Sequence, residues 1–295
     1  MPRLRFGAHM PTAGGLYKAV LSGYRIGCDA VQLFTASPRQ WNAPEIKPEA
    51  VRAFRRAVEK TGIHPLIAHD SYLINLATQD EALLTKSRNA FLREMERAEA
   101  LGLDYVVTHM GAHTGAGEEA GIAKLAESLN WLHAQLPDCR VRVALETTAG
   151  QGTCLGGTFA HFPQILERLE RPDRISVCLD TCHIFVAGYD LRTAETARAT
   201  WDDFERNVGF ERLCCIHAND AVKGLGSHTD RHAHIGGGTI GNVGFAAFLS
   251  DPRIPEGTPV IVETPEAESM HRVNVWHLRR LAEGMAPSTE AAAVD

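Results

Sequence analysis

Residues 175–183 read ISVCLDTCH, an aliphatic run that ends at Asp180 and His183. A short, continuous apolar run of this kind predicts a buried strand over Ile175–Asp180. Its ionisable Asp and His residues come only at the carboxyl end. The same form recurs along the chain, and stretches with helical spacing of apolar residues, such as Glu81–Leu101, lie between the runs.

Alternating strands and helices therefore organise the whole sequence. The other predicted strands are Leu4–Ala8, Ala30–Phe34, Pro65–His69, Tyr105–His109, Val141–Glu146, Leu213–His217 and Pro259–Glu263. The predicted helices are Gly15–Ile26, Pro48–Thr61, Glu81–Leu101, Glu118–Leu136, His161–Leu169, Thr193–Val208 and His271–Gly284. Such alternation is typical of a parallel sheet, because each parallel crossover needs a covering helix.

Eight strands alternating with seven predicted helices predict an α/β fold, a single-domain (β/α)8 TIM barrel over residues 1–285. An open doubly wound sheet is the alternative. No linker divides the chain, and the last segment, APSTEAAAVD (286–295), is predicted to be a disordered tail.

Composition sets the class of protein. The chain has 295 residues, with 44% hydrophobic and 22% charged residues, as in ordinary globular domains. No apolar run approaches the roughly 18 residues of a membrane span, so we expect neither a membrane segment nor a secretory leader. The seven cysteines form no Cys-x-x-Cys pair, which predicts a reducing, cytoplasmic location and no thiolate zinc site. The net charge of −6 argues against a nucleic-acid binder unless positive charge is supplied locally.

Ionisable side chains end six successive predicted strands. They are His69, His109, Glu146, Asp180 with the nearby His183, His217 and Glu263, and the loop after the seventh strand adds Asp230 and His232. In a parallel barrel all carboxyl ends lie on one face, so these nine residues should converge on a single mouth. Extended backbone at Asp230-x-His232 would put both side chains on the same side.

The ligand types predict the chemistry. Imidazole and carboxylate groups without thiolates suit Zn, Mn or Fe in a reactive site, and nine ligands are enough for two or three ions. Ions about 3.5–4 Å apart form a clamp for in-line displacement at phosphorus. Four carboxylates with three dications leave a net positive pocket, which would attract a phosphate to an acidic protein.

Nucleotide-binding motifs are weak or absent. Residues 236–241 fit G-x-G-x-x-G, but they follow a His/Asp loop rather than an early strand. There is also no phosphate loop of the G-x-x-x-x-G-K-[ST] type. We therefore expect no nucleotide cofactor.

Several long motifs resemble the endonuclease IV family of apurinic/apyrimidinic DNA repair endonucleases. They are GAHMPTAGG (7–15), FTASPRQW (34–41), HDSYLINL (69–76), LETTAGQG (145–152), CLDTCHIFVAGYDLRT (178–193), HANDAVKGLGSHTDRHAHIGGGTIG (217–241) and IVET (261–264). The resemblance spans roughly residues 4–284. It implies a (β/α)8 barrel with three zinc ions, for which manganese can substitute, and a monomer.

The resemblance also implies roles for individual residues. His69, His109 and a bridging Glu146 would hold the first ion, and Glu146, Asp180, His217 and Glu263 the second. His183, Asp230 and His232 would hold the third. The candidate catalytic residues are Glu146, Asp180 and Glu263.

The implied substrate is double-stranded DNA with abasic sites or blocked 3′ ends. The implied reaction is hydrolysis of the phosphodiester 5′ to an abasic site, leaving a 3′-hydroxyl, with trimming of blocked 3′ ends at the same centre. Arg39, Gln40 and Tyr72, on loops at the mouth, are the candidate DNA contacts, because side chains that fill a vacated base stack reduce the cost of distorting a duplex.

Two other functions stay open from the sequence. One is a two-metal sugar isomerase or epimerase, which would need only about four ligands. The other is a metal-stabilised protein that binds damaged DNA without cutting it.

Overall fold

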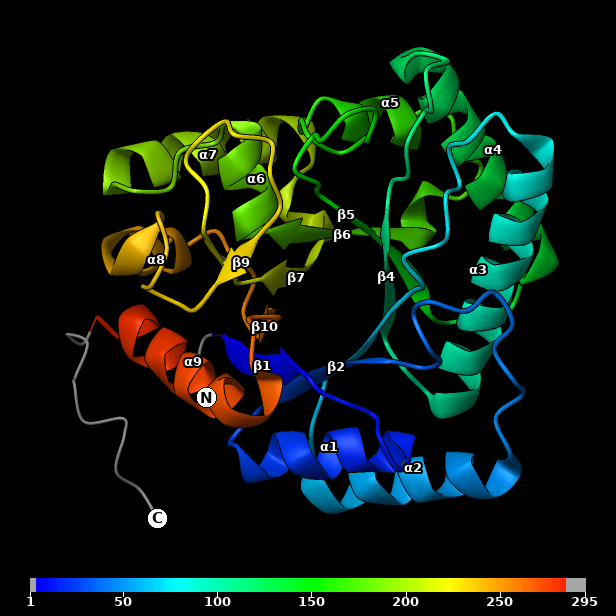
Figure 1. The fold of residues 1–295 in the computed structure, drawn as a ribbon, viewed down its shortest axis with the longest axis horizontal. Helices are drawn as coiled ribbons and strands as arrows, with labels where there is room; N and C mark the ends of the chain where they lie inside the picture. Colours follow the sequence, from blue (N-terminus) through cyan, green and yellow to red (C-terminus); the bar gives the residue numbers. More distant parts are fainter. Residues whose placement is uncertain (1–3, 285–295) are drawn as a thin grey trace.

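The computed structural model describes residues 4–284, and these residues form one closed barrel of parallel strands (Figure 1). Its strands are β1 (Arg5–His9), β2 (Ala30–Phe34), β3 (Leu66–His69), β4 (Tyr105–His109), β5 (Arg142–Glu146), β6 (Ile175–Asp180), β7 (Leu213–His217) and β10 (Pro259–Val262). They follow one another round the barrel in chain order, and β10 closes it by pairing with both β7 and β1. This confirms the predicted single-domain TIM barrel and excludes the open sheet.

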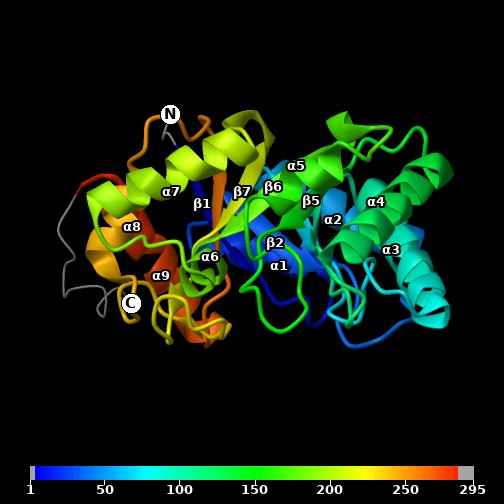
Figure 2. The ribbon, with the colours of Figure 1, turned by 90° about the horizontal axis from the view of Figure 1, so that it is seen from above.

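Helices surround the strands on the outside (Figures 1 and 2). They are α1 (Leu16–Arg25), α2 (Pro48–Thr61), α3 (Glu81–Leu101), α4 (Glu118–Gln135), α5 (His161–Leu166), α6 (Thr181–Ala187), α7 (Ala194–Asn207), α8 (Gly241–Leu249) and α9 (Ala267–Ala282), with short 3-10 turns at Pro172–Arg174 and Phe210–Arg212. Apart from the short helix α6, they place one crossover helix after each barrel strand, as parallel strands require.

Local sequence explains where these elements begin and end. The Asp80 side chain accepts hydrogen bonds from the amides of Ala82 and Leu83 and so caps the start of α3. Gly102, with φ of 79°, ends the same helix in the left-handed conformation that glycine adopts without strain. Gly7 in β1 has a different reason, because a Cβ there would lie 2.0 Å from the carbonyl oxygen of Ala30.

Two hydrophobic clusters stabilise the described barrel. The large one lies between the strands and the helices and includes fully buried rings such as Phe54 and Trp201. The small one fills the inside of the barrel and consists of Ala30, Ile67, Val107, Ala144, Cys178, Cys214, Cys215 and Ile261. It supports the mouth from below.

The structure differs from the prediction at several boundaries. Helix α9 begins four residues before its predicted start at His271, and Glu263 lies just after β10 rather than within it. The helices α6 and α8 were not predicted, nor was the antiparallel pair β8 (Asp220–Ala221) and β9 (His232–Ala233). The predicted tail at 286–295 lies outside the described residues, so that prediction and the exact domain limits stay predictions.

None of the helices within residues 4–284 is long and apolar enough to cross a membrane.

Candidate metal centre

The nine predicted ligands meet at the carboxyl ends of the barrel strands. His69, His109, Glu146, Asp180 and His217 are each the last residue of a strand, and Glu263 directly follows one. His183 comes from the first turn of α6. Asp230 and His232 come from the long excursion between β7 and α8. The candidate ligand atoms fall into three groups, and within each group they lie within 4.8 Å of one another.

The first group contains His69, His109 and Glu146. Oε2 of Glu146 lies 3.1 Å from Nε2 of His69 and 3.2 Å from Nε2 of His109. Nδ1 of His69 donates a hydrogen bond to the carbonyl oxygen of Asp70 at 3.0 Å. That bond fixes the ring so that Nε2 is free to hold an ion.

The second group contains Glu146, Asp180, His217 and Glu263. Nδ1 of His217 lies 2.9 Å from Oε1 of Glu146 and 3.2 Å from Oε2 of Glu263. Glu146 therefore faces the first group with one carboxylate oxygen and the second group with the other. This geometry is suited to a carboxylate shared between two adjacent ions.

The third group contains His183, Asp230 and His232. The two oxygens of Asp230 lie 3.2 Å from Nε2 of His183 and 3.2 Å from Nε2 of His232. Nδ1 of His183 donates to the carbonyl oxygen of Thr147 at 2.8 Å, so its Nε2 is directed to the group. The side chain of Asp230 is 40% exposed, whereas the barrel ligands Glu146 and Asp180 are fully buried.

Buried charge dominates the electrostatics of the three groups. Burial alone would lower the pKa of His69, but the Glu146 carboxylate, with Asp70 and Glu263, raises that pKa to about 9. For Glu146, burial would raise the pKa, and the surrounding histidines, His217 first, hold it well below its usual range. Without ions, histidine protons thus balance the carboxylates. Dications at these positions would take over that balance, so ion binding should release protons.

Two buried amide side chains position the ligands, and the sequence alone did not point to either. Gln32 in β2 accepts from Nε2 of His217 at 2.7 Å through its oxygen, and its Nε2 donates to Oε1 of Glu263 at 2.6 Å. Asn219 donates to Oδ2 of Asp180 at 2.7 Å and accepts from the Glu263 amide at 2.8 Å. The only sequence signal for Gln32 is a polar residue inside the apolar run AVQLF.

The predicted DNA-contact residues lie beside the mouth. Arg39 and Gln40 are exposed on the loop between β2 and α2, and Tyr72, 60% exposed, follows β3. The hydroxyl of Ser71 donates to the carbonyl oxygen of Pro38 at 2.8 Å, which ties the two loops together. The Tyr72 ring lies 5.9 Å from the His69 ring.

The backbone amides of the glycine loop at residues 236–241, which resembles a dinucleotide-binding motif, bind a side chain of the protein itself. The buried carboxylate of Asp220 accepts hydrogen bonds from the amides of Gly236, Gly238, Ile240 and Gly241. These amides are therefore directed at a side chain of the protein. The bonds also anchor the far end of the excursion that carries the third group.

Cysteines come closer to the centre than their spacing predicted. All seven are free thiols, yet Cys178 and Cys215 group with His217, and Cys182 groups with Asp180 and His232. The cysteine spacing gave no sign of these neighbours, because Cys178 and Cys215 meet only through the register of β6 with β7. The absence of a thiolate zinc site stays a prediction.

Known proteins have a similar sequence and a similar fold. Residues 24–283 match the family described as the xylose isomerase-like TIM barrel. A probable endonuclease 4 from Chloroflexus aurantiacus is 47% identical over 282 residues, covering 95% of this chain and 99% of that protein. A probable endonuclease 4 from Geobacter sulfurreducens is 45% identical over 277 residues, covering 93% of each.

Solved structures agree at the level of the fold. Endonuclease IV from Thermus thermophilus superposes with a TM-score of 0.84 at 35% identity, covering 95% of this chain and 99% of that one. A D-tagatose 3-epimerase-like protein reaches a TM-score of 0.71 at only 17% identity, covering 96% of this chain and 100% of that one, so it shares the barrel alone.

Proposed function

The chain belongs to the endonuclease IV family, and on this premise we propose that it is a metal-dependent apurinic/apyrimidinic endonuclease of base excision repair. In this proposal it hydrolyses the phosphodiester 5′ to an abasic site and leaves a 3′-hydroxyl. Trimming of 3′-phosphate and phosphoglycolate ends takes place at the same centre.

One observation carries the proposal: three adjacent groups of histidines and carboxylates line one mouth, and Glu146 faces two of them. Hard oxygen and imidazole donors fit zinc, with manganese as a substitute, and the three groups fit three ions per chain. When bound, such a cluster supplies a hydroxide near neutral pH and neutralises charge on the leaving oxygen.

The residues of the chain have separate tasks in this reaction. Glu146, Asp180 and Glu263 supply the negative charge that would hold the metal ions beside the attacked phosphate. With His183, Asp230 and His232 on the more exposed side would hold a third ion, which would neutralise charge on the departing 3′ oxygen. Arg39, Gln40 and Tyr72 contact the duplex and fill the gap left by the missing base.

We take the partner to be double-stranded DNA, with no nucleotide cofactor, and the protein to act as a monomer. Seven free thiols support a reducing compartment, hence the cytoplasm, where the enzyme reaches the chromosome.

Incubation with a duplex that carries one tetrahydrofuran abasic analogue tests the function. We expect a single cut on the 5′ side of the analogue, no cut in the undamaged duplex, loss of cutting with a chelator and recovery with added zinc. Tight binding of the damaged duplex without any cut would instead support a binding protein. Conversion of a ketose to its epimer without DNA cleavage would support the sugar-epimerase alternative.

A further inference from the structure

A layer of small and apolar side chains closes the barrel below the centre. Seven of the eight barrel strands each contribute one residue to this layer, and that residue comes two positions before one that faces into the mouth. The seven are Ala30, Ile67, Val107, Ala144, Cys178, Cys215 and Ile261. We call these seven residues the floor. Cys178 and Cys215 are its only residues with metal-binding side chains.

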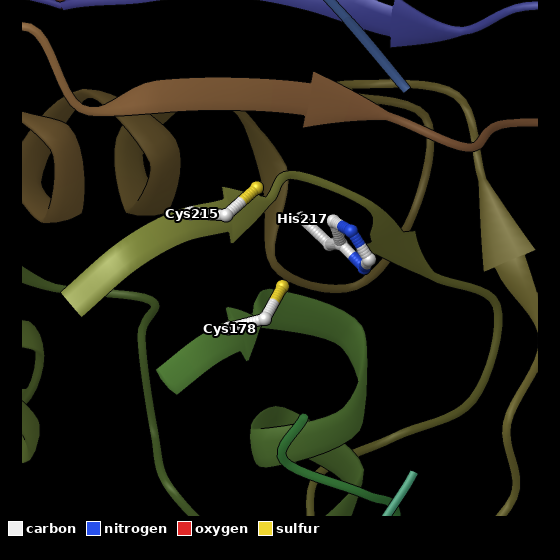
Figure 3. A group of neighbouring side chains, drawn as sticks. All are labelled: Cys178, Cys215 and His217. Atoms are coloured by element: carbon white, nitrogen blue, oxygen red, sulfur yellow. The ribbon is translucent and has the colours of Figure 1, made fainter. Parts of the chain in front are cut away.

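The two floor cysteines lie side by side. They are register partners on β6 and β7, directly below the pair formed by Asp180 and His217. Figure 3 shows both thiols with the His217 ring beside them. One ligand atom from each of the three residues lies within 4.8 Å of the others, and Cys178, Cys215 and His217 are each 0% exposed.

We propose that Cys178, Cys215 and His217 form a second kind of metal site, one for a thiophilic d10 dication such as cadmium, beneath the oxygen-rich centre. Zinc-like bonds of about 2.3 Å to sulfur and 2.1 Å to nitrogen place tetrahedral ligands about 3.6 Å apart, so small side-chain movements from the present positions suffice. Soft thiolates select soft ions over the hard ions that carboxylates prefer.

Charge balance favours this site inside an apolar floor. Binding one dication releases the two thiol protons, so two thiolates and one M²⁺ give a neutral unit with a neutral imidazole. A neutral unit avoids the cost of an uncompensated charge next to Ala144 and Ile261. No oxidant or reductant is needed.

The site competes with the centre above it. Nδ1 of His217 faces Glu146 and Glu263, and Nε2 is bonded to Gln32, so either ring nitrogen gives up a contact when a floor ion binds. A thiophilic ion should therefore weaken the second ligand group. The loss of activity that follows rests on the proposed function, whereas binding at the floor does not.

Cadmium titration of the full-length, zinc-loaded protein tests the site directly. We expect a thiolate-to-cadmium charge-transfer absorbance that saturates at one ion per chain in the wild type. Cys178→Ser and Cys215→Ser should each weaken cadmium binding about tenfold or more. Cys214→Ser, one position away on β7 and outside the group, is the matched control and should keep the band.

A wild-type measurement guards against variants that fold poorly. Cadmium-113 NMR should give a resonance in the range of two sulfur ligands and one nitrogen ligand. A resonance in the range of oxygen and nitrogen ligands alone, or an absorbance band that persists in the double variant Cys178→Ser/Cys215→Ser, overturns the proposal.

A cleavage assay then separates the two proposals. Cadmium should inhibit cleavage of abasic DNA by the wild type and by Cys214→Ser at least about tenfold more strongly than by the double variant. If the protein cuts no DNA but shows the thiolate band, the function is wrong and the site stands. If it cuts DNA without the band, the site is wrong and the function stands.

Discussion

Replacement of Gln32 by leucine removes the side chain that orients two ligands of the second group. The side-chain amide of Gln32 forms hydrogen bonds with His217, Glu263 and His9, and all of these contacts lie within the barrel mouth. Leucine has a similar volume but no polar atom. The change therefore isolates hydrogen bonding from packing.

The expected magnitude follows from the burial of each partner. His217 is fully buried, so its Nε2–H loses the Gln32 acceptor, at a cost of about 1–3 kcal/mol. Glu263 and His9 keep side-chain exposures of 18% and 14%, so water can partly replace the lost donor. Freed ring rotation of His217 should lower zinc affinity about 10–100-fold, equal to about 1.4–2.7 kcal/mol.

Competition with a chromophoric chelator measures zinc affinity, and thermal unfolding with and without zinc measures stability. We expect the variant to lose zinc at a lower chelator concentration and to gain less stability from added zinc. Leu33→Met, the next residue of β2, is the matched control, because Leu33 belongs to the packing between strands and helices. Unchanged zinc affinity in Gln32→Leu would refute the assigned role of Gln32.

Four further outcomes are expected. Glu263→Gln should lower cleavage about a hundredfold or more, because an amide cannot supply the carboxylate charge, while abasic DNA binding stays measurable; full activity contradicts the assignment. Elemental analysis should find close to three transition metals per chain, and one or none would count against the centre. Tyr72→Ala and Arg39→Ala should weaken binding to abasic DNA about tenfold and more than to intact duplex, whereas Tyr24→Ala, equally exposed on α1, should change neither. Burial, with Arg174 and Arg171 nearby, lowers the pKa of His133 from 6.5 to about 4. The unfolded chain therefore takes up this proton first as pH falls below 6.5, and stability is lost down to about pH 4. Between pH 7 and 4.5, the free energy of unfolding measured in urea should fall by about 2 kcal/mol less in His133→Leu than in the wild type. Equal falls in the two proteins would exclude this role of His133.

Sequence reasoning predicted the barrel because its strands are buried on both sides and read as short apolar runs. The run over Ala30–Phe34 and the run over Tyr105–His109 match the observed strands residue for residue. Helix α6 was missed because TCHIFVA directly continues an apolar strand without a break. Helix α8 was missed because its start overlaps the glycine-rich loop around Asp220.

The same reasoning predicted which residues the mouth gathers but not how they are held. Ligands at strand ends converge in any parallel barrel, so the meeting of His109 and Glu146 at one mouth could be predicted without coordinates. Their assignment to the same ion came from the family resemblance. The role of Gln32 depends on which strands lie opposite it across the barrel, and the spacing of residues along one strand does not predict that arrangement. The thiol pair of Cys178 and Cys215 was missed for the same reason.

The position of β10 in the chain has a consequence for biosynthesis. This strand is the last of the barrel to leave the ribosome, and it both pairs with β1 and β7 and carries Glu263 at its end. Closure of the barrel and completion of the four-ligand group therefore both require this segment. A nascent polypeptide that stops short of residue 263 has neither, so translation itself delays the moment at which the catalyst becomes competent.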